Sequence, residues 1–291
     1  MVVTTEILPC PAIQPYVRCY TLREFDTAGS DFLKPLPANH EFTLAFTLTG
    51  SLSTAKTSFG DNISGSQQHL IGLQTAYKGS VIFNGNVKLF TMQFTPNGFY
   101  RLFNLPVSLL TDKIYKISDI INKGISVYIE HLNEAKDITA LKGLTDHFLL
   151  SCLAKSKKTD PNNSITSASS LIFEKQGNIN IKNLAYEANM CLRTFELRFT
   201  EQVGISPKMY ARLTRFNQAI LIRIKNKLTS WTDISHQCGY YDQMHFIKEF
   251  KQFAGDSPSN FYKSTPLPFE DYRKYKKSHR NSTILYYSFA S

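Results

Sequence analysis

Residues 195–210 read FELRFTEQVGISPKMY, and 51 positions later residues 246–261 read FIKEFKQFAGDSPSNF. Each stretch has two phenylalanines four residues apart, a spacing that puts both on one face of a helix. Each then continues with Gly-X-Ser-Pro, which is typical of one helix ending and another beginning. The shared positions are Phe195 and Phe246, Phe199 and Phe250, Gly204 and Gly255, Ser206 and Ser257, Pro207 and Pro258, and Tyr210 and Phe261. The repeat therefore predicts two copies of one helical unit in the C-terminal third.

A short amphipathic segment and a tight turn precede each copy. The segments are residues 181–188 and 232–238, and the turns are Asn189-Met190 and Gly239-Tyr240. Each unit is therefore expected to be a helix-turn-helix. Two such units about one helical turn of B-DNA apart would place two helices in the major groove. The arrangement predicts a DNA-binding protein.

A long helix is expected between the two copies. Ser206 suits its N-cap, Pro207 suits its first turn, and apolar positions continue to Asn226. The helix would join the two units rigidly. The second copy closes with another short helix from Ser257-Pro258, which Pro266 and Pro268 end.

Composition and charge are consistent with this prediction. A chain of 291 residues, 42% of them hydrophobic, suggests about two domains with cores of their own. It has no apolar run long enough for a membrane span and no signal-peptide pattern, so we expect a soluble, cytoplasmic protein without a membrane partner. Residues 1–150 hold 12 Lys and Arg against 12 Asp and Glu, whereas residues 151–291 hold 21 against 11. The whole net charge of +10 thus lies in the half with the repeat, which favours a polyanionic partner over a merely solvated basic surface.

The N-terminal half has a different pattern. Residues 42–48 alternate as a strand that ends at Gly50, and residues 81–83 and 87–94 resemble a hairpin with a turn at Asn84-Gly85. A short helix at 99–103 and two longer ones near 117–134 and 137–154 follow; this pair would pack on the sheet or on a second subunit. The fold class is therefore an α+β N-terminal domain, with a barrel-like or open sheet followed by helices, plus an all-α C-terminal domain.

Polar residues mark the boundary between the two domains. Residues 155–164 are charged and turn-rich, and helical periodicity resumes at Ile165 with a C-cap at Gly177. We expect a sensor or dimerisation domain over 1–155, a linker over 156–164, a DNA-binding domain over 165–266 and a basic, aromatic tail over 267–291. The tail either adds phosphate contacts or is a solvated extension.

The C-terminal residues closely resemble the DNA-binding domain of the AraC/XylS family of bacterial transcription regulators. The resemblance covers about 100 residues and rests on Leu184-Ala185, Met190, Arg193, Phe195, Phe199, Gly204-Ile-Ser-Pro207, Tyr210, Arg215, Ala219, Asp233-Ile234, Gly239-Tyr240, Asp242-Gln243, His245-Phe246, Phe250-Lys251, Phe253, Gly255, Ser257-Pro258 and Tyr262. The N-terminal stretch at 94–106, followed by Leu110-Thr-Asp112, looks like the sensor-type domain in one branch of that family. The resemblance implies that two helices enter successive major grooves on one face of DNA; a bent or imperfectly engaged site is equally compatible with the sequence.

The side chains that face DNA follow from the inward phenylalanines. On the first recognition helix the outward residues are Arg193, Thr194, Glu196, Leu197 and Arg198. Arg193 suits a guanine or a phosphate, and Arg198 a phosphate, unless either is an ordinary solvated side chain. Cys191 and Leu197 depart from the family's usual Ser cap and basic residue, and Glu196 would repel phosphates unless it accepts from a cytosine amine.

The second recognition helix presents a different set. Its outward residues are Gln243, Met244, His245, Ile247 and Lys248. Gln243 can read adenine, Met244 and Ile247 can touch thymine methyls, and Lys248 can reach a phosphate or a guanine. In some regulators of this type only one helix reads bases while the other anchors the DNA backbone, so a base contact and a backbone contact are both left open for each residue.

Catalysis is not indicated. His40, His69, Cys10 and Cys19 form no metal-ligand spacing, and the five cysteines (Cys10, Cys19, Cys152, Cys191 and Cys238) include no C-x-x-C pair, so we expect no cofactor, no metal and no disulfide framework. A DNA-repair methyl acceptor would need two close cysteine pairs, and nucleotide-binding, nucleophile-elbow and zinc-protease motifs do not occur.

The expected function is therefore a sequence-specific transcription regulator, not an enzyme. Its expected partners are double-stranded DNA, RNA polymerase, a small-molecule effector and a second copy of the chain. The alternative is an architectural or competitor DNA-binding protein whose N-terminal domain mediates only protein contacts, because its aromatic residues suit a packed core as well as a ligand pocket.

Overall fold

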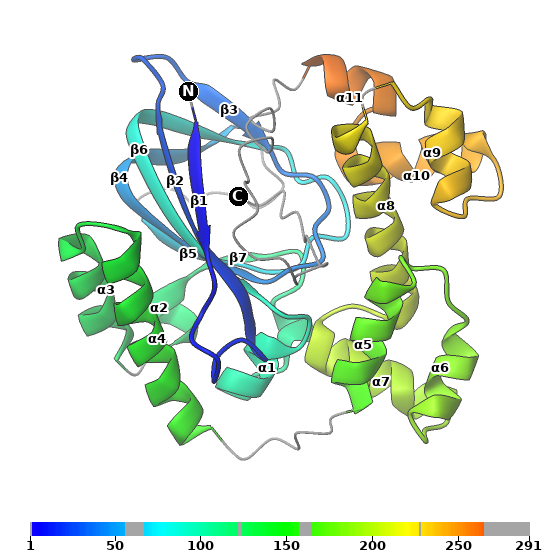
Figure 1. The fold of residues 1–291 in the computed structure, drawn as a ribbon, viewed down its shortest axis with the longest axis horizontal. Coiled ribbons are helices and arrows are strands. Elements are labelled where there is room, and N and C mark those ends of the chain that lie inside the picture. The colour runs from blue at the N-terminus through cyan, green and yellow to red at the C-terminus, as the bar shows by residue number, and fades with distance from the viewer. Residues whose placement is uncertain (1, 56–66, 122–123, 157–163, 227, 265–291) are drawn as a thin grey trace.

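A sheet-based N-terminal half and a helical C-terminal half lie side by side (Figure 1), which confirms the expected fold class. A computed structural model describes residues 2–55, 67–121, 124–156, 164–226 and 228–264. The predicted tail at 267–291 and nearly all of the predicted linker at 156–164 lie outside these residues. The last helix of the first half ends at Lys155, and the first helix of the second half begins at Ser164.

An antiparallel sheet forms the N-terminal half. Its strands run in the order β1-β2-β6-β4-β5-β7, and β3 pairs with one end of β6. Their bounds are β1 (Val3–Ile7), β2 (Val17–Asp26), β3 (Phe32–Pro35), β4 (Thr43–Ala55), β5 (Gln68–Ile71), β6 (Ser80–Phe94) and β7 (Ile114–Lys116). Alternating residues of the central strands bring buried aromatic and aliphatic side chains to one face, where Tyr20 pairs with Met92 and Phe46 with Phe90. This face is the core side of the sheet.

Two helices cover that face, α3 (Ile125–Glu134) and α4 (Ile138–Lys155). The Tyr128 ring of α3 stacks on Phe148 of α4, with centroids 4.4 Å apart, and meets Phe46 of the sheet edge-on at 5.7 Å. The predicted helix pair therefore packs on the sheet. The helix predicted over 117–134 is divided into α2 (Ile117–Ile120) and α3: Ile121 ends α2 in an extended conformation, and Gly124 precedes α3 in a left-handed conformation with φ of 79°.

The predicted hairpin at Asn84-Gly85 is wrong, and so is the strand end at Gly50. Strand β6 passes through Gly85, and β4 passes through Gly50 to reach Ala55. The two glycines face each other across the strands with φ of 90° and 80°, where the β4 register shifts between Thr47 and Ser51. Glycine lets both long strands bend together here, as in a bulge, so the same residues that suit a turn instead continue the sheet.

The C-terminal half consists of helices α5 (Ser164–Glu174), α6 (Ile181–Glu187), α7 (Leu192–Val203), α8 (Pro207–Lys225), α9 (Trp231–Gln237), α10 (Gln243–Ala254) and α11 (Pro258–Ser264). The long helix α8 runs between the α6–α7 pair and the α9–α10 pair (Figure 1). The Ser206 hydroxyl accepts a hydrogen bond from the Met209 amide at 3.2 Å, and Pro207 occupies the first turn. The predicted cap and joining helix are thus confirmed.

Candidate nucleic-acid interface

The two helix pairs have the same local construction. We call α6 with α7 the first unit, and α9 with α10 the second unit. In the first, the Met190 amide bonds to Ala185 O at 3.0 Å; in the second, the Tyr240 amide bonds to Ser235 O, also at 3.0 Å. Asn189 and Gly239 take left-handed conformations in the two turns. The predicted helix-turn-helix pattern is confirmed in both units.

Buried phenylalanines set the orientation of the recognition helices α7 and α10. Phe195 and Phe199 of α7 are fully buried, as are Phe246 and Phe250 of α10. Because each pair occupies one helix face, the opposite face of each helix must point to solvent. This geometry leaves a side-chain surface on each helix for a groove of DNA.

The outer face of α7 carries most of the residues predicted for it. The exposed residues are Arg193, Glu196, Leu197 and Arg198, of which Leu197 is 63% exposed. Thr194 is half-buried, and its hydroxyl lies 3.1 Å from the Cys191 thiol at the helix N-terminus. The structure therefore brings together a mixed face of two basic residues, one acidic residue and one aliphatic residue, while Thr194 contacts its own helix end.

The outer face of α10 is less polar. The exposed residues are Gln243, Met244, His245 and Lys248, and Met244 is 74% exposed. The His245 ring contacts the Tyr240 ring edge-on, with centroids 5.6 Å apart. Ile247 is half-buried and packs against the hydrophobic core, so only part of this side chain is accessible. Of the five residues predicted here, Ile247 is the least available to a partner.

The N-termini of the two recognition helices differ. Asp242 caps α10, because its carboxylate accepts from the His245 amide at 2.7 Å. Cys191 occupies the same position on α7 and makes no side-chain cap hydrogen bond. The hydrogen bond with the Thr194 side chain lowers the pKa of the exposed Cys191 thiol. The first unit therefore lacks a cap interaction that the second has.

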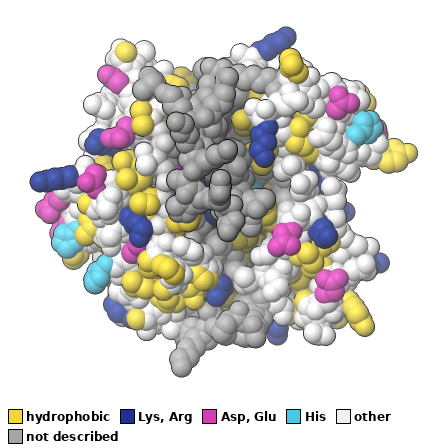
Figure 2. All heavy atoms as spheres, in the orientation of Figure 1, with side chains coloured by type: hydrophobic (Ala, Val, Ile, Leu, Met, Phe, Trp, Pro, Cys, Tyr) yellow, Lys and Arg dark blue, Asp and Glu magenta, His cyan; other side chains and the backbone are white. Residues whose placement is uncertain are grey.

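Tyr241 is an exposed residue that the sequence prediction missed. The turn residues of the two units are 50 positions apart, but the helix caps Cys191 and Asp242 are 51 apart, so the second turn contains one additional residue. That residue is Tyr241, which is 92% exposed beside the start of α10. The change of offset was visible in the sequence and marks the insertion. Figure 2 shows hydrophobic side chains protruding from the helical half of the molecule.

Two arginines of α8 make contacts within the helical half. Arg212 of α8 pairs with Glu249 of α10 at 2.7 Å, and Tyr240 donates to the same carboxylate at 2.9 Å. Arg223 covers the Trp231 ring at 4.9 Å and donates to Thr229 O at 2.7 Å. These guanidinium groups attach the second unit to α8. On the face in Figure 2, Lys and Arg side chains lie scattered among acidic ones.

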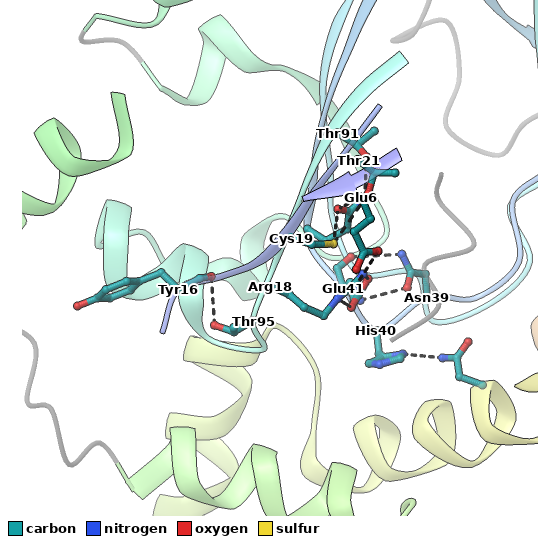
Figure 3. Close-up of polar contacts among 12 residues, drawn as sticks. Glu6, Tyr16, Arg18, Cys19, Thr21, Asn39, His40, Glu41, Thr91 and Thr95 are labelled. Carbon is teal, nitrogen blue, oxygen red and sulfur yellow. Dashed lines mark hydrogen bonds and ion pairs between the residues drawn. The ribbon is translucent and has the colours of Figure 1, made fainter. Parts of the chain in front are cut away.

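Buried polar side chains mark the boundary between the two halves (Figure 3). Arg18 makes a two-pronged ion pair with Glu41, with distances of 2.9 and 3.4 Å. Next to it, Asn217 of α8 donates its amide to His40 Nδ1 at 2.5 Å, and burial, aided by the charge of Arg18, lowers the pKa of His40 to about 3. His40 is therefore neutral at physiological pH. A small pocket opens at this boundary, lined by Arg18, His40, Glu41, Phe94, Thr95, Pro96 and Tyr210.

Within the described part of the chain, no three His, Cys, Asp or Glu side chains are placed to hold a metal ion. The five cysteines are all unbridged; Cys191 is exposed, Cys19 and Cys238 are buried, and Cys10 and Cys152 are intermediate. No helix among the described residues combines the length and apolar character needed to cross a bilayer.

Comparisons with known proteins match the two halves separately. Residues 184–264 match the family described as "Helix-turn-helix domain", and residues 5–116 match a "Domain of unknown function (DUF6597)". An uncharacterized HTH-type transcriptional regulator of Haemophilus influenzae is 29% identical over 102 residues, which are 35% of this chain and 34% of the relative. The HTH-type transcriptional activator RhaS of Escherichia coli is 29% identical over 80 residues, 28% of each chain. The chain thus spans about a third or less of the curated relatives it matches.

Two solved structures are also similar. The structure of ToxT from Vibrio cholerae covers 84% of this chain and 97% of its own, with 13% identity and a TM-score of 0.45. The DNA-binding domain of AdpA, solved in complex with a target DNA, covers 40% of this chain and all of its own, with 20% identity and a TM-score of 0.33.

Proposed function

We propose that this protein is a transcription regulator of the AraC type that binds specific DNA sequences through both of its units, because residues 184–264 match a helix-turn-helix domain and resemble part of an HTH-type transcriptional regulator. Its action is equilibrium binding to DNA. The observation that carries the proposal is the pair of recognition helices, each with its phenylalanines buried and its opposite face exposed.

The exposed side chains define the proposed contacts. Arg193 makes a bidentate contact with a guanine or binds a phosphate, and Arg198, further along the helix, contacts a phosphate. Gln243 reads adenine, and Met244 lies against a thymine methyl. Lys248 reaches a phosphate or a guanine, and the aromatic ring of Tyr241 adds an apolar contact at the start of α10. Glu196 accepts a hydrogen bond from a cytosine amine.

The N-terminal half controls this binding in the proposal. The boundary with α8 contains the His40–Asn217 hydrogen bond and, beside it, the Arg18–Glu41 pair, and these contacts are the proposed route from the sheet to the helix that joins the two units. A small-molecule effector or a second copy of the chain would act through this half. DNA-bound protein would then recruit or block RNA polymerase.

The test is selection of DNA fragments by the purified full-length protein. We would select from genomic fragments at two salt concentrations with competitor DNA present, because phosphate contacts weaken steeply with salt whereas base contacts give sequence preference. Recovery of a motif with two sub-motifs about 10 base pairs apart is expected. Salt-sensitive retention without any sequence preference would overturn the proposal and favour the architectural DNA-binding protein.

A further inference from the structure

Both recognition helices end in a glycine that touches the N-terminal half. Gly204 follows α7 with φ of 98°, and Gly255 follows α10 with φ of 84°. These are equivalent positions of the two units, 51 residues apart. A left-handed glycine is the common end of a helix, and the lack of a side chain also permits a close approach by another segment. In this protein each of the two glycines both ends its helix and lets a segment of the N-terminal half approach closely.

Gly204 lies against the loop between the short 3-10 helix Val107–Leu109 and β7. The Thr111 hydroxyl donates to Gly204 O at 2.7 Å. A Cβ added at Gly204 would meet Thr111 Oγ1 at 2.8 Å and the Phe42 ring at 3.4 Å. Two residues before Gly204, Gln202 accepts a hydrogen bond through its Oε1 from the Asn97 side chain at 3.3 Å. The C-terminal end of α7 is therefore seated on the N-terminal half.

Gly255 lies against a second loop of the same half. A Cβ added there would meet atoms of the Tyr77 ring at 2.6 to 2.8 Å. The Tyr77 amide donates to Gln252 O at 3.2 Å, and the Ala38 amide donates to Phe253 O at 2.7 Å. These two backbone bonds satisfy carbonyl groups in the last turn of α10, which have no partner within a helix. The C-terminal end of α10 therefore contacts the N-terminal half, as the C-terminal end of α7 does.

Asp112 ties the two loops together. Its carboxylate accepts from the Thr75 amide at 2.8 Å and from the Thr75 hydroxyl at 2.5 Å, and it pairs with Lys78 at 2.9 Å. Its own amide donates to Leu73 O at 2.7 Å. We call residues 73–78 and 110–112 the bracket. The loop that carries Tyr77 and the loop that carries Thr111 are consequently parts of one cross-linked piece.

We propose that the bracket positions the second recognition helix relative to the first, so that Tyr77, Thr111 and Asp112 determine which spacing of sub-motifs the protein accepts. This inference rests on the proposed function. Helix α8 joins the units along the chain and packs against the second unit, where the Phe216 ring lies 5.2 Å from the rings of Phe250 and Phe253. The bracket adds contacts at the ends of α7 and α10, so both recognition helices meet the same cross-linked piece of the N-terminal half.

The experiment measures affinity of the full chain for a series of DNA duplexes in which the two selected sub-motifs are moved together or apart by single base pairs. The wild-type protein is expected to prefer one spacing by about tenfold over its neighbours, the cost of one lost base contact. Tyr77→Ala and Thr111→Val should reduce this preference to about twofold. A residue with a merely structural role would lower affinity equally at every spacing.

Two matched variants serve as controls. Tyr77→Phe retains the ring against Gly255, and Thr49→Val removes a hydroxyl-to-carbonyl bond of the same 2.7 Å length between Thr49 and Asn86, within the sheet. Both should keep the wild-type spacing preference. Thr111→Val changes only one polar contact, so it remains informative even if Tyr77→Ala unfolds.

The outcomes separate the two proposals. If the wild-type protein shows no sequence preference on any duplex, the proposed function fails and the positioning role fails with it. If the wild-type protein binds specifically but the bracket variants keep its spacing preference, only the positioning role is overturned. Flattened spacing preference in the two bracket variants, with intact preference in the controls, supports it.

Discussion

Arg193 and Lys248 are exposed on the outer faces of the two recognition helices. If each contacts a base, substitution by alanine should weaken operator binding by about 1–3 kcal/mol and relax the preference at one base position. The measurement is a salt-matched titration against the operator and its single-base variants. Lys116→Ala, which removes an exposed positive charge from the N-terminal half, is the control. An even loss across all sequences would indicate a phosphate contact, and no loss in either variant would refute the assignment.

His40 predicts a pH dependence of stability at the domain boundary. Burial lowers its pKa in the folded protein to about 3, whereas its pKa in the unfolded chain is about 6.5. Between these values the unfolded chain binds the additional proton, so the stability contribution of neutral His40 is complete above pH 6.5 and declines as the pH falls toward 3. Between pH 7.0 and 5.5 the free energy of unfolding should fall by about 1 kcal/mol from this group. Denaturant unfolding of His40→Gln should lack that component; identical pH dependence in both proteins would contradict it.

At the scale of elements, the N-terminus of α7 predicts a stabilising substitution. Ser206, Ser230 and Asp242 cap their helices through side-chain oxygens, but Cys191 does not. A serine hydroxyl at this position can accept from the Thr194 amide, so Cys191→Ser should raise the free energy of unfolding by about 0.5–1 kcal/mol. Urea unfolding measures the change, with Cys191→Ala as the control that supplies no acceptor. Equal stability of the two variants would exclude the missing cap as the cause.

Elements differ in how far local sequence predicts them. Helices α7, α8 and α10 were predictable because their caps, glycines and apolar spacing lie within the helix itself. The course of β4 and β6 was not, because Asn84-Gly85 suits a turn and a bulge equally well. Pairing with β2, β3 and β4 continues β6 through that position, and those partners are distant in sequence.

At the scale of the whole molecule, the two units carry different side chains at equivalent positions. The pairs are Arg193 and Met244, Thr194 and His245, Glu196 and Ile247, and Leu197 and Lys248. One chain should therefore read two unlike sub-motifs in a fixed order. Exchanging the sub-motifs in a duplex of unchanged spacing should cost at least about 3 kcal/mol, since each mismatched base pair costs about 1–3 kcal/mol. A duplex with one sub-motif inverted is the second comparison. Equal affinity for the original, exchanged and inverted duplexes would contradict the prediction that the two recognition helices bind different sub-motifs.

The amino-acid sequence by itself determined the two helix-turn-helix units, their joining helix and the outward set of side chains, because short-range spacing fixes which face of a helix is apolar. Tertiary structure decided how available each of those side chains is, as Ile247 and Thr194 show by their partial burial. It also decided that the helix ends at Gly204 and Gly255 meet Thr111 and Tyr77. Those contacts join residues 93 and 178 positions apart, and no local pattern of polarity specifies which distant loop a helix end will touch.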